Sequence, residues 1–300
     1  MDKLPPETRV QILSMLVEGS SMRAISRVAG VSINTVTKLL EDAGETCIAL
    51  HDEKVRNVKS KRLQCDEIWS FNYCKKANLP NATKAPEKAG DVWTWTAVDA
   101  DSKLIISYFV GNRDGEHALE FIGDLGSRLV DRPQITTDWL ASYISAIDEN
   151  FGIDVDFAQL IKSYSDTPDQ NGPERRYSPG VCTGISKRKI VGNPAREHVS
   201  TSYVESHNQK IRAHMRRFTR LTAGHSKKFA NHCHALALYF MYYNFVKIHS
   251  TLRMSPAMAA GIETRLWEMS DIVAAMDDRA PKPGPRGPYR KAEVASQNSN

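Results

Sequence analysis

The chain has 300 residues, with 40 Lys and Arg against 35 Asp and Glu, which gives a formal net charge of +5. Hydrophobic residues make up 41% of it, enough for a sizeable core, and its five cysteines form no Cys-x-x-Cys pair, which argues against a disulfide framework or a structural zinc site. The longest apolar run, residues 235–243, is too short to cross a bilayer and no N-terminal signal segment is predicted, so we expect a cytoplasmic, nucleoid-associated protein with no membrane partner.

Residues 1–45 predict a small all-α domain. Apolar residues recur at helical spacing over 8–17, 21–28 and 33–41, and Gly30 falls in the turn before the third helix. This pattern is typical of a helix-turn-helix domain, whose third helix enters the major groove of DNA. An ordinary three-helix bundle is the alternative. The side chains of the third helix that we expect to contact DNA are Asn34, Thr35, Thr37 and Lys38.

A basic linker is predicted over residues 46–62, and a mixed α/β domain over residues 63–255. The alternation of apolar and polar residues indicates strands, and apolar residues at helical spacing indicate helices, in the order β-β-β-α-β-α-β. The predicted strands are 63–71, 92–98, 104–110, 133–138 and 156–160, and the predicted helices between them are 116–129 and 143–151.

The rest of the chain is predicted to be mainly helical after one long irregular insertion at about 165–200, which is rich in Pro, Gly and Ser. Helices are expected at 202–217 and 227–249, and a C-terminal helical segment at 256–279. Residues 280–300 carry four prolines among basic residues and predict a flexible basic tail.

Three carboxylates fall at positions that favour a shared site. Asp66 lies in the middle of an apolar strand, where an isolated charge is costly unless it is paired or binds a metal. Asp138 ends the fourth strand, and Glu205 lies in the first turns of a helix. We expect the first and fourth strands to lie side by side, so that Asp66 and Asp138 meet and the packed helix adds Glu205. The alternative is that Asp66 ends a strand and faces water.

Three carboxylates suit Mg²⁺ or Mn²⁺, and a pair of such ions can assist an in-line phosphoryl displacement. A basic row accompanies them. Between residues 207 and 228 there are seven Lys or Arg and no Asp or Glu, and the helix positions on the face of Glu205 include polar and basic residues. A solvated polar helix face is the alternative. The residues of this region predicted to bind DNA are Asn208, Arg212, Arg216 and Arg217.

Several of these segments resemble a known superfamily. The residues around the three carboxylates, Gln64–Phe71, Thr136–Tyr143 and Tyr203–Asn208, together with Tyr243–Leu252, are similar to the DDE transposases and retroviral-type integrases. Among these, the sequence looks most like the transposase of the IS1 insertion-sequence family. The resemblance extends over residues 63–267. It departs from the family in having no cysteine cluster before Pro5 and in having Ser206 where a basic residue is common.

The resemblance implies an RNase H-like core in which Asp66, Asp138 and Glu205 are catalytic and hold two Mg²⁺ ions, for which Mn²⁺ can substitute. It implies a DNA transposase that binds the terminal inverted repeats of its insertion sequence, then cleaves the DNA and joins it to target DNA. Arg212 would help to hold the DNA end. The expected partners are double-stranded DNA and at least a second copy of the chain.

Two other classes of protein remain as alternatives. A helix-turn-helix regulator with an inert transposase-derived core would have no need to keep three mutually repelling carboxylates. A tyrosine recombinase would use Arg and His residues around a Tyr nucleophile, and it leaves the three carboxylates without a role.

Overall fold

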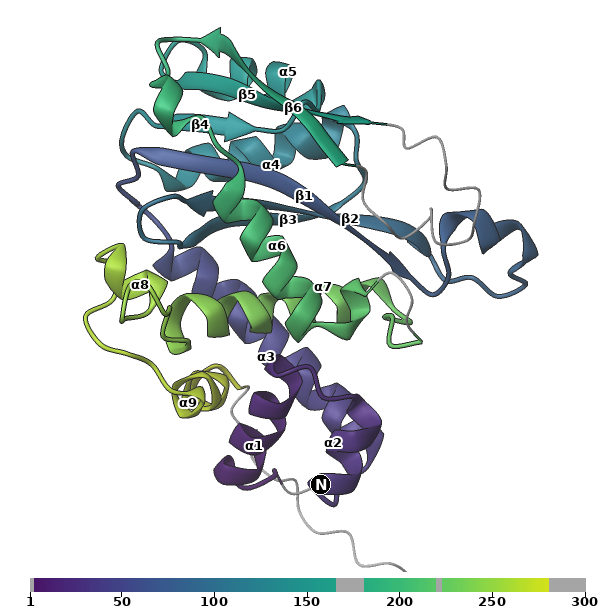
Figure 1. The fold of residues 1–300 in the computed structure, drawn as a ribbon. Helices are drawn as coiled ribbons and strands as arrows, with labels where there is room; N and C mark the ends of the chain where they lie inside the picture. The colour runs from purple at the N-terminus through teal and green to yellow at the C-terminus, as the bar shows by residue number, and fades with distance from the viewer. Residues whose placement is uncertain (1–2, 166–180, 220–222, 281–300) are drawn as a thin grey trace, which may run out of the picture.

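The computed structural model describes residues 3–165, 181–219 and 223–280. Its centre is a six-stranded mixed sheet in the order β3-β2-β1-β4-β5-β6. In Figure 1 the helices α4 and α5 lie behind this sheet, α6 crosses its front, and α7 lies below it against α3. The strands are β1 (Arg62–Asn72), β2 (Gly90–Asp99), β3 (Ile105–Gly111), β4 (Gln134–Thr137), β5 (Asp156–Ser165) and β6 (Val181–Val191).

The α-helices lie close to the predicted segments, although several of their ends differ. They are α1 (Pro6–Val17), α2 (Met22–Val28), α3 (Ile33–Lys54), α4 (Gly115–Arg128), α5 (Ser142–Phe151), α6 (Ser202–His214), α7 (Phe229–Met241), α8 (Pro256–Ala259) and α9 (Met269–Arg279). None of the helices in the described ranges combines the length and the apolar character that crossing a lipid bilayer requires.

The first three strands form an antiparallel meander, and β1 also pairs in parallel with β4, with Leu63 opposite Ile135. The prediction that the first and fourth strands are neighbours is therefore confirmed. The helix α4 connects β3 to β4 and packs against β3, and its buried residues Phe121 and Ile122 face the core. This connection brings the end of β4 next to the middle of β1.

The N-terminal helices share their main hydrophobic core with the rest of the chain, since this core extends from Ile12 in α1 to Met276 in α9. Ser21 and Ser32 cap α2 and α3, accepting hydrogen bonds from the backbone N–H groups of Ala24 and Thr35. The predicted linker at 46–62 is wrong in its first half, since α3 continues to Lys54. Cys47 and Leu50 keep the buried face of this helix turned toward the core.

The two halves of the molecule are held together where α3 packs against α7. At Gly44 of α3, an added Cβ would lie 2.3 Å from the Cβ and 2.5 Å from the Cα of His234. The close approach of these two helices thus requires glycine at this position.

We expect Gly44→Ala to destabilise the protein by about 1–3 kcal/mol, as overpacking does, although alanine is favoured over glycine in a helix by about 1 kcal/mol. The measurement is the urea unfolding midpoint. Gly115→Ala is the control, because nothing lies within 4 Å of a Cβ added at that position. If Gly44→Ala proved as stable as Gly115→Ala, the packing of α3 on α7 would be looser than described here.

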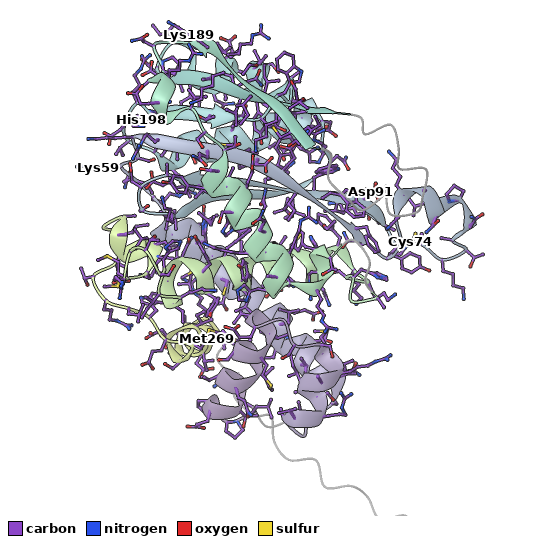
Figure 2. The ribbon with its side chains drawn as sticks, viewed as in Figure 1. Lys59, Cys74, Asp91, Lys189, His198 and Met269 are labelled. Carbon is purple, nitrogen blue, oxygen red and sulfur yellow. The ribbon has the colours of Figure 1, made fainter. Side chains whose placement is uncertain are left out.

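The predicted insertion at 165–200 is also corrected in part. Residues 181–191 form the edge strand β6, which pairs with β5, and residues 166–180 lie outside the described residues. Figure 2 shows Lys189 on this outer strand, far from Met269 at the start of α9. Residues 182–189 are exposed, so β6 buries little and is held by backbone pairing. Its lysines and arginine are typical of edge strands that resist pairing with other chains.

Three further boundaries differ from the predictions. The helix α6 ends at His214, so that Arg216 and Arg217 follow it in a 3₁₀ turn, Arg216–Phe218. After α7, a π-turn over Tyr242–Val246 closes the segment that was predicted to be helical as far as residue 249. The predicted basic tail, apart from residue 280, lies outside the described residues.

Candidate active site

Asp66 occupies the middle of β1, between the buried residues Cys65 and Glu67. Its Oδ2 accepts a hydrogen bond of 2.8 Å from Nδ2 of Asn208 in α6. The start of α6 is also tied to β1, because Oε1 of Gln64 accepts hydrogen bonds from the backbone N–H groups of Tyr203 and Val204. The helix that carries Glu205 is therefore docked directly over the strand that carries Asp66.

Asp138 directly follows β4, and the loop around it is held by hydrogen bonds. Its Oδ1 accepts a bond of 3.0 Å from the backbone N–H of Leu140, and Gln159 of β5 donates to the Asp138 carbonyl oxygen at 3.0 Å. The side chain lies close enough to Asp66 and Glu67 for one oxygen of each of the three to lie within 4.8 Å of the others. The predicted meeting of Asp66 and Asp138 is thus present.

Glu67 was missed in the sequence, because neighbouring residues on a strand point to opposite faces of the sheet. Its side chain is 1% exposed. The Nε of Arg113 lies 2.5 Å from Oε1, and the Tyr143 hydroxyl donates to Oε2 at 3.1 Å. Arg113 also approaches Asp138, with Nη2 at 3.5 Å from Oδ2. The only signal for Glu67 in the sequence was its position next to Asp66.

Glu205 lies near the three-carboxylate group without belonging to it. Its Oε1 is contacted by the ammonium of Lys162 from β5 and by the Thr201 hydroxyl, the latter at 2.5 Å. Its charge is among the causes that raise the pKa values of Asp66 and Asp138, so it faces the same space. Of the predicted triad, Asp66 and Asp138 lie close together, whereas Glu205 lies on α6 about one turn before Asn208.

The charges of this site repel one another. Burial raises the pKa of Asp66 to about 8, and the nearby carboxylates of Glu67 and Asp138 add to the effect. Burial also raises the pKa values of Glu67 and Asp138. A divalent cation would relieve this repulsion, and carboxylate oxygens are ligands that hard divalent cations prefer. The residues present therefore fit a divalent metal site.

We expect the contribution of Asp66 to the stability of the metal-free protein to fall as the pH rises from about 4 to about 8. The folded-state pKa of Asp66, about 8, lies above its unfolded value of 3.8, so in this window the folded state binds more of the Asp66 proton than the unfolded state does, and this contribution falls with each pH step. Asp66→Asn should flatten this dependence. The measurement is urea unfolding in EDTA at several pH values, with the difference between wild type and variant taken at each. An unchanged slope in the variant would contradict the assignment.

The residues predicted to bind DNA have different surroundings. On α3, Asn34 and Lys38 are exposed, whereas the hydroxyls of Thr35 and Thr37 bond within the helix and its cap. On α6, Asn208 is buried against Asp66 rather than turned to solvent. The predicted row on one helix face stops at Arg212, which donates to the Phe218 carbonyl oxygen, because Arg216 lies beyond the end of the helix.

No protein-family model matches this sequence, and no curated protein matches it. Among solved structures, the chain is similar to piggyBac transposase in a synaptic complex with hairpin DNA, with a TM-score of 0.40 and 9% identity over 93% of this chain and 73% of that one. It is also similar to the Mos1 transposase paired-end complex with left transposon end (TM-score 0.24, 15% identity, 52% of this chain and 60% of that one). The corresponding values for the Mos1 strand transfer complex are 0.23, 14%, 52% and 60%. These structures are all of transposases.

Proposed function

We propose that the chain is a DNA transposase that cuts and joins DNA in a Mg²⁺-dependent reaction at Asp66, Asp138 and Glu205. The observation that supports this most strongly is the meeting of carboxylates from β1 and the end of β4, with Glu205 facing them from α6. A purely structural role would not require a cluster of carboxylates that repel one another. The sequence motifs around these residues favour the IS1 type of transposase among the possible classes.

The chain's own residues would position the ligands. Asn208 holds Oδ2 of Asp66, so Asp66 would offer Oδ1. The Leu140 backbone N–H holds Oδ1 of Asp138, and Oδ2, which Asp138 would offer, lies 3.5 Å from Nη2 of Arg113. Arg113 neutralises Glu67 and limits the negative charge. Bound Mg²⁺ would lower the pKa of an attacking water or hydroxyl group and stabilise the leaving oxygen. The protein would contribute by fixing the positions of the reacting groups.

Recognition of the terminal inverted repeats would fall to the first turns of α3. Asn34 and Lys38 are exposed there, and Thr35 and Thr37 lie between them. Since two DNA ends must be joined in one event, we propose that the protein acts on double-stranded DNA as a homodimer or a larger assembly. The arrangement favours a transposase over a tyrosine recombinase, which would have no use for the carboxylate cluster.

The experiment that tests this proposal is strand transfer. A labelled duplex ending in the element's terminal repeat is incubated with supercoiled plasmid and the protein, in Mg²⁺, in Mn²⁺ and in EDTA. Joined products that require the divalent ion are expected. Tight binding of the repeat without nicking or joining in either metal would contradict the proposal and favour a DNA-binding regulator with an inert core.

A further inference from the structure

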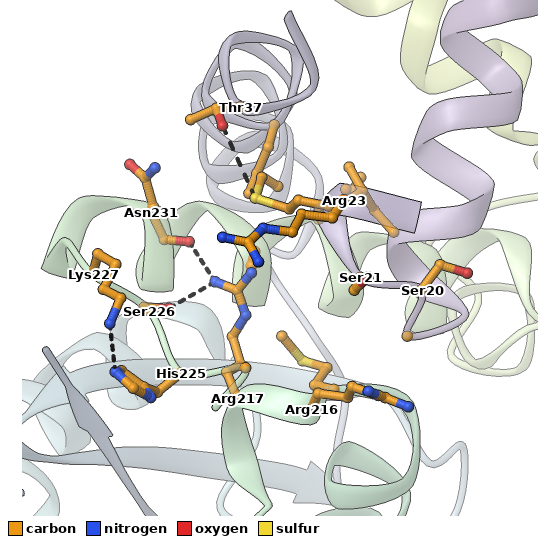
Figure 3. Close-up of a pocket in the computed structure, with 18 of the residues that line it drawn as sticks. Ser20, Ser21, Arg23, Thr37, Arg216, Arg217, His225, Ser226, Lys227 and Asn231 are labelled. Atoms are coloured by element: carbon orange, nitrogen blue, oxygen red, sulfur yellow. Dashed lines mark hydrogen bonds between the residues drawn. The ribbon is translucent and has the colours of Figure 1, made fainter. Parts of the chain in front are cut away.

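A pocket of about 740 Å³ lies between the N-terminal helices and the segment that connects α6 to α7. Figure 3 shows its lining. One wall comes from the end of α1, the start of α2 and the first two turns of α3, and the other from the 3₁₀ turn after α6, the residues before α7 and one face of α7. The pocket therefore joins two parts of the chain that are distant in sequence, and His214 at its border lies about 13 Å from Glu205 along the axis of α6.

The lining is strongly cationic. The described residues that line the pocket include Arg23 from α2, Arg216 and Arg217 after α6, and Lys227 and Lys228 before α7, and none of them is Asp or Glu. In Figure 3 the guanidinium groups of Arg23 and Arg217 point toward the same space. The carboxylate of Glu18 lies beside the pocket, with Oε2 3.6 Å from Nδ1 of the lining residue His214. One carboxylate does not balance five basic residues, and an excess of like charge favours an anionic ligand.

Arg217 is the fixed member of this group. Its Nη1 donates hydrogen bonds of 2.8 Å to the Ser226 hydroxyl and to the Asn231 carbonyl oxygen, which hold the guanidinium in one orientation. Burial lowers its pKa to about 10, and no carboxylate of the described residues is among the causes of this shift. A guanidinium held in this way is ready to bind a phosphate with its remaining N–H groups.

The pocket also contains residues predicted separately as DNA contacts. Asn34 and Thr37 of α3 line it together with Arg216 and Arg217, so side chains from the proposed recognition helix and from the region after α6 meet here. From Glu205 to His214, which borders the pocket, α6 rises by about 13 Å. This corresponds to about four base pairs at 3.4 Å per phosphate of one strand.

Resting on the proposed function, we propose that this pocket binds phosphate groups of one DNA strand, which Arg23 and Arg217 contact together, about four base pairs from the bond that is cut. The site would link the sequence-recognising helices to the carboxylates, because one strand segment is held from both sides. DNA bound in this way fixes the distance between the recognised repeat and the site of cleavage.

The test uses binding rather than catalysis, so that it does not depend on the proposed activity. The affinity of the full chain for a 30-base-pair terminal-repeat duplex is measured by fluorescence anisotropy at a series of salt concentrations, in EDTA. Arg23→Gln and Arg217→Gln should each weaken binding at least about tenfold, since a hydrogen bond to a charged group is lost. Each should also reduce the slope of the logarithm of the binding constant against the logarithm of the salt concentration by about one unit.

Arg27→Gln is the matched control, because Arg27 is an exposed arginine on the same helix, α2, outside the pocket. It should change affinity less than about twofold. Arg217→Gln removes the bonds to Ser226 and Asn231 and could unfold the protein. In that case the test depends on Arg23→Gln alone, since Arg23 is exposed and its substitution should leave the fold intact. The double variant should lose less than the product of the two single losses, since both side chains contact the same strand segment.

An equal loss from Arg23→Gln and Arg27→Gln, or an unchanged salt slope in Arg23→Gln, would overturn the pocket as a phosphate site. Inorganic phosphate is a second probe. If it raises the melting temperature of wild type and of Arg23→Gln equally, the pocket is not where it binds, and the proposal fails. If the protein catalyses strand transfer but the variants show none of these binding effects, the phosphate site is contradicted and the proposed function stands. If the binding effects are seen without strand transfer, only the proposed function is contradicted.

Discussion

Asp66→Asn and Asp138→Asn should each lower the rate of strand transfer at least about 10³-fold, because a catalytic metal provides several kcal/mol of transition-state stabilisation and about 1.4 kcal/mol corresponds to a factor of ten. Glu205→Gln should do the same if it completes the metal site. The measurement is single-turnover joining of a labelled repeat end. Affinity for the duplex should stay within about threefold of wild type, since these residues are not phosphate contacts.

Glu67→Gln tests whether Glu67 supports the metal site or is itself the third metal ligand in place of Glu205. Because its carboxylate is bound by Arg113 and Tyr143, we expect a supporting role and a loss of only about 10- to 100-fold. Asp131→Asn is the control, as an exposed carboxylate in the loop before β4. If Glu67→Gln abolished joining while Glu205→Gln remained active, Glu67 would be the third ligand in place of Glu205.

The second large effect is on stability. Arg113→Gln leaves the carboxylate of Glu67 buried without its charged partner, since the Glu67 side chain is 1% exposed and the Arg113 side chain 38%. We expect a loss of about 3 kcal/mol near pH 8, at the low end for a broken buried pair because the guanidinium is partly exposed. Equilibrium unfolding in urea measures it.

The pH dependence of this loss has a definite sign. Arg113 lowers the pKa of Glu67, whose burial raises it, so without Arg113 the carboxyl keeps its proton to higher pH. The cost should therefore be smallest at low pH, where Glu67 is protonated in both proteins, and should grow as the pH rises. Glu67→Gln should cost less, because Tyr143 can still donate to the amide oxygen. Arg265→Gln, which breaks the exposed pair with Asp271, should cost no more than about 1 kcal/mol.

The sheet could be predicted because its strands carry their burial pattern in local sequence. In β1, apolar residues around Asp66 indicate a core strand, and the hairpin of β2 and β3 follows from the short turn between them. The edge strand β6 could not be predicted, because residues 182–189 are all exposed and show no alternation of buried and exposed positions. Its formation depends on pairing with β5, a contact between segments that the sequence does not reveal.

The extension of α3 was missed for a related reason. Polar residues after Ala43 suggested a linker, whereas the helix continues because Cys47 and Leu50 pack in the core beside α7. Helices gain most of their stability from tertiary packing rather than from intrinsic propensity. The predicted DNA-binding helices and the predicted α/β domain consequently contribute side chains to one main hydrophobic core, apart from which Ala158, Leu160 and Val199 form a smaller cluster.

By itself, the sequence predicted which residues would carry the chemistry: three carboxylates in apolar or helical contexts, and a basic region after Glu205. Charge and burial along the chain are local properties, and they identify such residues without coordinates. Only the tertiary structure decided their partners, placing Glu67 and Arg113 beside Asp138 and Lys162 on Glu205. It also brought Arg23 and Arg217 into one pocket. Distances between segments far apart in the chain depend on packing, and packing is a property of the whole fold.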